Sequence, residues 1–187
     1  PALAGGPAAA AVAGAVPVVQ PRCKAHTRGG DSRACAPDPA RLRAESEELT
    51  AAMAALSSSG AHAPMRAQRQ SLPACSMRAT LLSEIARSQV LVVSGETGCG
   101  KSTQVPQYIL EEAVETGRGA ECTILVLQPR RVAAISLARR VAAERGEEVG
   151  GSVGYKIRQE SKSSRRTRIL FATTGVLLRR PHPDTQL

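Results

Sequence analysis

The spacing of apolar positions predicts a long helix that begins near residue 39. Asp38 followed by Pro39 is typical of a helix start, because the aspartate caps the first turn and proline fits its first position. Apolar side chains then recur at helical spacing as far as Leu56. The apolar stripe is short, which favours docking of this helix on the rest of the chain over pairing with a partner helix.

Two continuous apolar runs further along the chain are typical of buried parallel strands. They cover Val90 to Val93 and Thr123 to Leu127, and a helix is expected before the first, over Leu81 to Ala86. A second helical segment, from Lys101 to about Thr116, lies between the two runs. This order of helix, strand, loop, helix and strand predicts a βαβ unit.

A similar alternation continues towards the end of the chain. We expect a helix over Val132 to Ala142 that ends at Gly146, then a strand at Val153 to Ile157. A turn through Ser161 to Arg166 leads to a last strand at Arg168 to Ala172. The fold class predicted is therefore α/β with a parallel sheet.

Residues 1–38 are rich in Ala, Gly and Pro and show no apolar period, so they are expected to be disordered. The first acidic residue in this tail is Asp31, and Arg22, Lys24 and Arg28 precede it, which is similar to an organellar transit peptide. A plain flexible tail explains the composition equally well. At 187 residues and 19.5 kDa, the chain has room for one ordinary domain.

Composition narrows the choice of partners. The formal net charge of +9 favours a polyanion, and nucleic acid is the obvious candidate. The three aromatic residues are too few for a platform of rings that stack on bases.

The five cysteines contain no CxxC pair, which argues against a zinc site or a disulfide framework and favours an intracellular protein, in the cytoplasm or nucleus. No uninterrupted apolar run is long enough to span a membrane, so no membrane partner is expected.

A phosphate-binding loop follows the first apolar run directly. It matches GxxxxGK[ST] and consists, in order, of Gly95, Glu96, Thr97, Gly98, Cys99, Gly100, Lys101 and Ser102. Its backbone N–H groups and the helix N-terminus favour a phosphate group, and the Lys101 ammonium is expected to reach the β and γ phosphates. The Ser102 hydroxyl is the expected Mg²⁺ ligand, and Thr103 adds one phosphate contact. Pro106 conflicts locally with the helix predicted after this loop.

Positive charge is concentrated downstream of this loop. Residues 128–187 hold 13 basic and 5 acidic side chains, against 12 and 11 in residues 1–127. Arg130 and Arg131 directly follow the second predicted strand, at the sheet edge where ligands of open α/β folds bind. A solvated basic face without a partner is the alternative, but the position of these arginines favours contacts with a nucleic-acid backbone.

Four ordered motifs resemble those of the DEAH/RNA helicase A type RNA helicases, in the front half of their first RecA-like domain. Residues 95–107 resemble motif I of that family in its extended form, including Pro106. Residues 128–134 resemble motif Ia, residues 154–158 are similar to the hook-turn strand that follows, and residues 173–175 resemble motif Ib. Met65, Arg69, Leu72 and Pro73 also resemble the lead-in of members that carry N-terminal extensions.

The resemblance implies ATP with Mg²⁺ as cofactor and an RNA backbone as partner. It implies RNA contacts for the motif residues Arg130, Arg131, Arg158, Thr173, Thr174 and Gly175. It also implies that Arg140 packs on the adenine face, which needs only a planar guanidinium and predicts poor discrimination among nucleoside triphosphates. Contacts through phosphate and sugar suit an enzyme that moves along RNA without reading its sequence.

One departure from the family concerns hydrolysis. The Asp-Glu-x-His motif is absent, since the only aspartates are Asp31, Asp38 and Asp184, and none follows an apolar run. We expect a helicase fragment with a tail at 1–38, a helix and linker at 39–68 and an incomplete RecA-like domain at 69–187, which hydrolyses ATP poorly on its own. The alternatives are a truncated nucleotide- or RNA-binding module without catalysis, and another type of P-loop NTPase.

Overall fold

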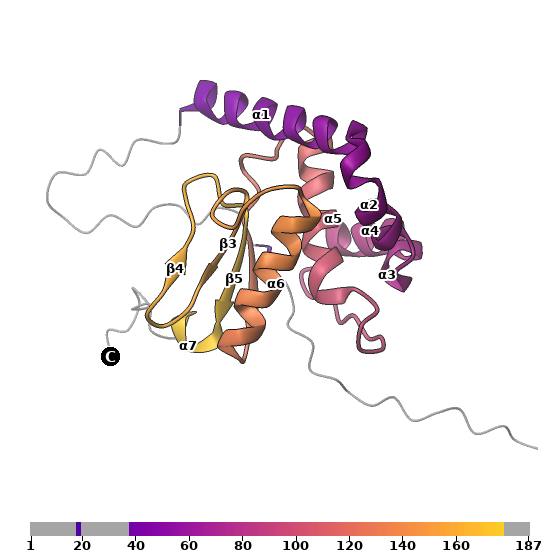
Figure 1. The fold of residues 1–187 in the computed structure, drawn as a ribbon, viewed down its shortest axis with the longest axis vertical. Helices are drawn as coiled ribbons and strands as arrows, with labels where there is room; N and C mark the ends of the chain where they lie inside the picture. The colour runs from indigo at the N-terminus through magenta and orange to yellow at the C-terminus, as the bar shows by residue number, and fades with distance from the viewer. Residues whose placement is uncertain (1–17, 20–37, 178–187) are drawn as a thin grey trace, which may run out of the picture.

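The computed structural model describes residues 18–19 and 38–177, and it folds them into a small sheet with helices packed around it (Figure 1). The strands are β1 (Val18–Val19), β2 (Ile124–Gln128), β3 (Val153–Lys156), β4 (Ser161–Lys162) and β5 (Ile169–Thr173). The helices are α1 (Pro39–Ser58), α2 (Ala63–Gln70), α3 (Pro73–Ser76), α4 (Arg78–Arg87), α5 (Lys101–Glu115), α6 (Arg131–Glu144) and α7 (Thr174–Leu177), and a single 3-10 turn covers Gly60–His62.

The sheet confirms the predicted α/β class. Its order is β1-β2-β5-β3-β4, and the three inner strands are parallel. The two edge strands are antiparallel to their neighbours. Neither edge strand was predicted: β4 lies where a turn was expected, and β1 lies within the tail to which no fold was assigned. Residues 1–17 and 20–37 of the predicted tail lie outside the described residues, as do residues 178–187.

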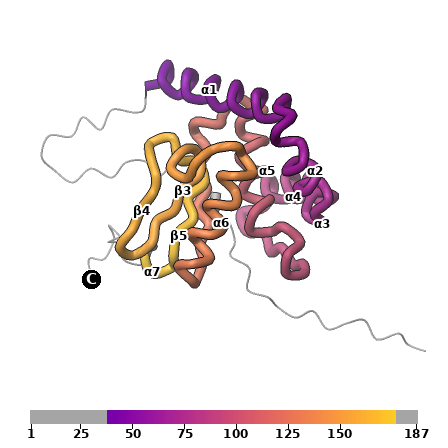
Figure 2. Tube along the Cα trace, viewed as in Figure 1, coloured from indigo at the N-terminus to yellow at the C-terminus, as the bar shows by residue number. Residues whose placement is uncertain are grey.

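Two helices pack on the inner strands and enclose the core. Helix α6 contacts β2, β3 and β5, while α5 contacts β2, β5 and α6 (Figure 2). The largest fully buried apolar side chains come from both helices and from the parallel strands, namely Leu110, Ile124, Val126, Val141, Val153, Ile169 and Phe171. Burial of these side chains from water is the main stabilising contribution.

The prediction of a strand at Val90 to Val93 is wrong. This segment carries no strand, and the side chains of Val90 and Val92 are 78% and 83% exposed. A strand needs a hydrogen-bonded neighbour, and none of the described strands pairs with residues 90–93. The outer edge of β2 pairs with β1, where Val18 lies opposite Leu125. The phosphate loop therefore follows an irregular segment, and the expected βαβ unit lacks its first strand.

The predicted start of α1 is confirmed, and the helix predicted after the phosphate loop forms despite its proline. Helix α1 begins at Pro39, and the Asp38 carboxylate accepts a hydrogen bond from the Ala40 backbone N–H at 3.0 Å. Helix α5 continues through Pro106, which lies fully buried inside it. Packing on the sheet thus outweighs the loss of one backbone hydrogen bond at the proline.

Helix α1 docks on the domain, as its short apolar stripe favoured. It crosses the end of the sheet opposite to α7 (Figure 1). The buried Ser46 hydroxyl accepts a hydrogen bond from the Ala120 backbone N–H at 3.1 Å, and Glu45 pairs with Arg168 at 2.7 Å. Helix α1 is therefore attached by polar contacts as well as by its apolar side chains.

Candidate nucleotide and RNA sites

The phosphate loop turns sharply through two glycines with left-handed backbones, Gly98 at φ +88° and Gly100 at φ +100°. A side chain at Gly100 would also meet Gln104 Cγ at 3.0 Å and Leu72 Cδ1 at 3.3 Å. Backbone conformation and lack of space both explain why glycine is needed at this second position.

Lys101 folds back over the loop that it follows. Its ammonium group donates hydrogen bonds to the carbonyl oxygens of Gly95 at 2.6 Å and Glu96 at 2.8 Å, and lies 3.4 Å from Cys99 Sγ. The positive charge is therefore held above the turn of the loop, beside the backbone that would surround a phosphate group.

The N-terminus of α5 lacks the usual compensation for its positive dipole end. Its cap residue, Gly100, has no side chain to accept a hydrogen bond, and the first turn contains no acidic residue. Anions are favoured at such an end. The half-buried Ser102 in the same turn supplies the kind of oxygen ligand that Mg²⁺ prefers. The residues of this loop therefore fit a phosphate group accompanied by Mg²⁺.

Helix α3 contacts the phosphate loop, a feature that the sequence patterns did not predict. The Ala74 backbone N–H donates to the Cys99 carbonyl oxygen at 3.0 Å. Between α3, α4 and the loop lies a mainly apolar hollow of about 270 Å³, whose lining includes Pro73, Met77, Leu81, Val93 and Val105. Leu72 and Pro73 in the lead-in were the only sequence signal for this contact.

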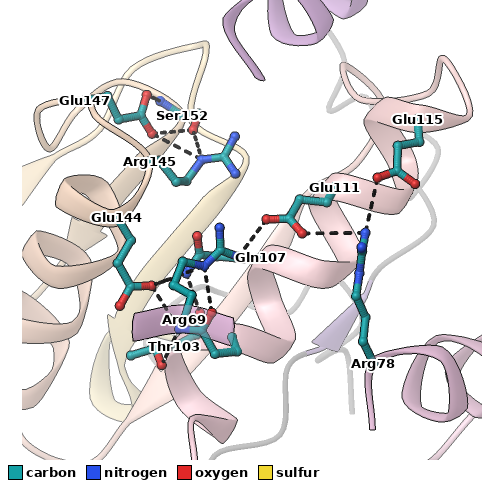
Figure 3. A network of polar contacts seen from close by, with 11 residues as sticks. Arg69, Arg78, Thr103, Gln107, Glu111, Glu115, Glu144, Arg145, Glu147 and Ser152 are labelled. Atoms are coloured by element: carbon teal, nitrogen blue, oxygen red, sulfur yellow. Dashed lines mark hydrogen bonds and ion pairs between the residues drawn. The ribbon is translucent and has the colours of Figure 1, made fainter. Parts of the chain in front are cut away.

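A buried polar cluster joins α5 to α6 (Figure 3). At its centre is Glu144, whose side chain is only 1% exposed. Its carboxylate accepts hydrogen bonds from Gln104 Nε2 at 2.9 Å, Gln107 Nε2 at 2.6 Å and Arg140 Nε at 2.6 Å. These donors satisfy a carboxylate that burial alone would strongly destabilise.

Arg69 of α2 extends the cluster towards the N-terminal helices. Its Nε donates to Gln104 Oε1 at 2.9 Å, and its terminal nitrogen donates to Glu111 at 2.7 Å. Arg78 approaches the other Glu111 oxygen at 3.6 Å. Neither Glu144 nor Glu111 was singled out in the sequence, because nothing local marks two residues on different helices as partners.

Arg140 is held by two partners on different elements. Besides Glu144, its guanidinium donates to Gln68 Oε1 at 2.8 Å, and 42% of its side chain is exposed. The planar group is thus oriented but not covered. Its contact with an adenine ring remains a prediction.

The register of the sheet brings three of the RNA motifs to one edge. Gln128 at the end of β2 lies opposite Thr173 at the end of β5, and Lys156 at the end of β3 lies opposite Ala172. Carboxyl ends of parallel strands meet at the same edge. The motif residues that directly follow these strand ends therefore share that edge, and they are Arg130, Arg131, Arg158, Thr174 and Gly175.

Position in the sheet separates these residues from two other arginines of the basic region. The five residues after the strand ends are exposed, whereas Thr173 itself is only 7% exposed. Arg166 and Arg168 precede β5 at the opposite edge, where they pair with Glu48 and Glu45 of α1. These two arginines therefore contact α1 and lie away from the edge that carries the RNA motif residues.

No helix in the described part of the chain is long and apolar enough to cross a membrane.

A phosphate loop at the start of a helix, beside a mostly parallel sheet, defines an α/β domain of the P-loop type, with part of a RecA-like sheet. No protein-family model matches the chain. Over 123 residues, 66% of this chain, it is 58% identical to the DExH-box ATP-dependent RNA helicase DExH1 of Arabidopsis thaliana. It is 60% identical over 119 residues to DExH3 of the same plant, covering 64% of this chain, and 48% identical over 126 residues to the ATP-dependent DNA/RNA helicase DHX36 of Bos taurus, covering 66%.

These matches confirm the resemblance to the helicase family. Over about two thirds of its length, the chain is homologous to DExH/DEAH-box ATP-dependent RNA helicases. It spans only 10 to 12% of the length of these three relatives.

Proposed function

We propose that this chain supplies the phosphate-binding half of the ATP site, and part of the RNA path, of an ATP-dependent RNA helicase. One observation carries the proposal: the same domain contains both an anion-binding helix end and a basic sheet edge. The N-terminus of α5 follows a glycine-rich loop and has no capping side chain, and the carboxyl edge of the parallel strands carries exposed basic and small residues. The relatives named above are described as ATP-dependent helicases acting on RNA, and in one case on DNA as well. An intracellular location, in cytoplasm or nucleus, follows from that function.

The residues of the loop would each do a distinct part of nucleotide binding. The backbone N–H groups of residues 98–102 surround the phosphates, and Lys101 exchanges its two carbonyl partners for phosphate oxygens. Ser102 and the triphosphate would hold Mg²⁺, which neutralises phosphate charge when bound. Arg140 would lie flat on the base, because Glu144 and Gln68 hold its edge and leave its face open.

Hydrolysis requires groups that these 187 residues do not provide. In phosphoryl transfer a carboxylate helps to hold the metal, and a further group orients the attacking water. None of the three aspartates follows an apolar run as the Asp-Glu-x-His motif would require. We therefore expect a protein of these residues to bind nucleotide without turning it over at an appreciable rate. A non-catalytic binding module would give the same result.

Calorimetric titration of the 187-residue chain with Mg·ATP tests the nucleotide half of the proposal. Saturable binding is expected, and Lys101→Ala should abolish it, because the ammonium is the loop's only side-chain positive charge. Ser102→Ala should reduce the gain in affinity that Mg²⁺ gives, while Ser94→Ala, just outside the loop, should not. Binding that survives Lys101→Ala would contradict the proposal.

In a helicase that contains this sequence, Lys101→Ala should abolish ATP-dependent unwinding and leave nucleotide-free RNA binding largely intact. Retained unwinding would contradict a helicase role for the loop. Another type of P-loop NTPase would bind Mg·ATP but show no RNA affinity that depends on Arg130 or Arg158. The RNA titration described in the Discussion therefore separates the two functions.

A further inference from the structure

We propose that Arg69 and Glu144 are positioning residues for the phosphate loop and that both act through Gln104, so that helix α2 forms part of the nucleotide site. The proposal rests on the nucleotide binding proposed above. It goes further by assigning a role to residues outside the loop motif, one of them on α2, which is separated from the motif by α3 and α4.

Gln104 is the residue that links this cluster to the loop. It lies in the first turn of α5, its backbone N–H donates to the Gly100 carbonyl oxygen at 2.7 Å, and its Cγ is among the atoms that leave no room for a side chain at Gly100. The residue is fully buried. Any shift of Gln104 would therefore displace the backbone that turns around the phosphate.

The amide of Gln104 has one defined orientation. Its oxygen accepts from Arg69 Nε at 2.9 Å, and its nitrogen donates to Glu144 at 2.9 Å. The second amide hydrogen points to Thr103 Oγ1 at 3.0 Å. Arg69 can only donate and the Glu144 carboxylate can only accept, so the pair excludes the flipped amide.

This arrangement determines what Thr103 offers to a ligand. Since the Thr103 hydroxyl oxygen already accepts from Gln104, its own proton is free to be donated, and in this structure it points to the Gly100 carbonyl oxygen at 3.3 Å. A phosphate oxygen needs a donor at that place. The cluster thus leaves the Thr103 proton available as a donor, and it packs Gln104 against the turn at Gly100.

A purely stabilising role for the cluster of Arg69, Gln104 and Glu144 does not explain why its contacts converge on α5. A purely stabilising cluster could be built from apolar side chains, often with equal or greater stability. Arg69 instead places its donors on Gln104 and Glu111, both on α5, and Glu144 bonds two glutamines of the same helix. All these contacts converge on the helix that begins with Lys101.

The test is the affinity of the full 187-residue chain for Mg·ATP, measured by calorimetry well below the melting temperature of each variant. Arg69→Met and Gln104→Glu should each weaken binding about 10-fold. Gln104→Glu places a carboxylate against Glu144, so adding Glu144→Gln should relieve the repulsion and recover most of the affinity. This reciprocal pair keeps the proposal testable if Arg69→Met does not fold.

Two controls separate positioning from stability. Arg66→Ala removes an arginine of the same helix whose side chain, among the described residues, bonds the Leu56 and Ser59 carbonyl oxygens, and it should leave the affinity unchanged. Val153→Ala lowers stability from the sheet core and shows how much affinity a loss of stability alone removes.

The outcomes are distinct. Affinity losses in Arg69→Met and Gln104→Glu that exceed the loss in Val153→Ala, with recovery in the double variant, support the proposal. Wild-type affinity in both single variants, or losses no larger than in Val153→Ala, would overturn it and leave the proposed function standing. If the wild-type chain binds no Mg·ATP, the proposed function and this proposal both fail.

Discussion

Gln128 and Thr173 lie directly opposite one another at the carboxyl ends of β2 and β5. This single pairing aligns the motif that follows β2 with the motif that follows β5, although the two are more than forty positions apart in the chain. Parallel strands make such an alignment possible because their carboxyl ends share an edge. The RNA path proposed above depends on this register.

Removal of a positive charge at this edge should weaken RNA binding and its dependence on salt together. For Arg130→Ala and Arg158→Ala, each assayed with single-stranded RNA by fluorescence anisotropy at several salt concentrations, the slope of log affinity against log salt should fall by about 0.7 per lost phosphate contact. The loss should be similar for RNAs of different sequence, because backbone contacts carry no sequence information.

Arg118→Ala is the matched control for this titration. Arg118 is an exposed arginine in the connection that enters β2, at the opposite edge of the sheet. Its removal changes the net charge equally. If it lowers the slope as much as Arg130→Ala does, the RNA path does not follow the carboxyl edge.

The sequence predicted the elements whose causes are local. The start of α1 needed only Asp38 and Pro39, and β2 and β5 needed only apolar runs bounded by polar residues. The run at Val90 to Val93 has the same local character but forms no strand, because none of the described strands pairs with it. Strand formation depends on a partner, and an apolar run carries no information about one.

The residues of the candidate site also fall into those that a local sequence pattern predicts and those that only the packing of helices brings together. The phosphate loop could be predicted because its chemistry depends on glycines, a lysine and a serine that are close together in the sequence. The cluster of Arg69, Gln104 and Glu144 joins three helices, and its partners become neighbours only when α2 and α6 pack against α5. No periodicity in a single sequence marks such a set.

The attachment of α1 should depend on Glu45 much more than on Glu48. Glu45 pairs with Arg168, whose side chain is 9% exposed, while Glu48 pairs with the exposed Arg166. Glu45→Gln should lower the free energy of unfolding by about 2 kcal/mol, because it leaves a nearly buried guanidinium without its charged partner. Glu48→Gln should lower it by less than about 1 kcal/mol. Chemical denaturation of both variants measures the difference, and equal losses would contradict this account.

The same pair gives the stability a dependence on acid. The hydrogen bond from Arg41, with the charges of Arg41 and Arg168, lowers the pKa of Glu45 below its ordinary value of 4.5. A lowered carboxyl pKa contributes stability above the ordinary value and loses it as the pH falls through the folded-state pKa. Denaturation curves between pH 5 and 3 should therefore converge for the wild type and Glu45→Gln. A difference that stays constant over this range would argue against the ion pair.

The exposed segment before the phosphate loop should promote self-association. Val90 and Val92 present apolar side chains to solvent, at 78% and 83% exposure. Val90→Thr with Val92→Thr should leave the free energy of unfolding within about 0.5 kcal/mol of wild type and reduce association in light scattering. Val126→Thr, at a fully buried position of β2, should instead destabilise the protein. Unchanged scattering in the double variant would mean that another surface mediates association.

Tyr108 should make the fold sensitive to alkali. Burial raises the pKa of this tyrosine from its ordinary value of 10.0 to about 12, and Arg78 lies 5.6 Å from the centre of its ring. The folded state then holds the phenolic proton more tightly than the unfolded chain does, so the free energy of unfolding should fall as the pH rises from about 10 towards 12. Tyr108→Phe removes this loss without removing the ring. Denaturation at pH 8 and pH 11 should show a smaller decrease for the variant than for wild type. Equal decreases would mean that the Tyr108 hydroxyl is ionised as readily in the folded protein as in the unfolded chain.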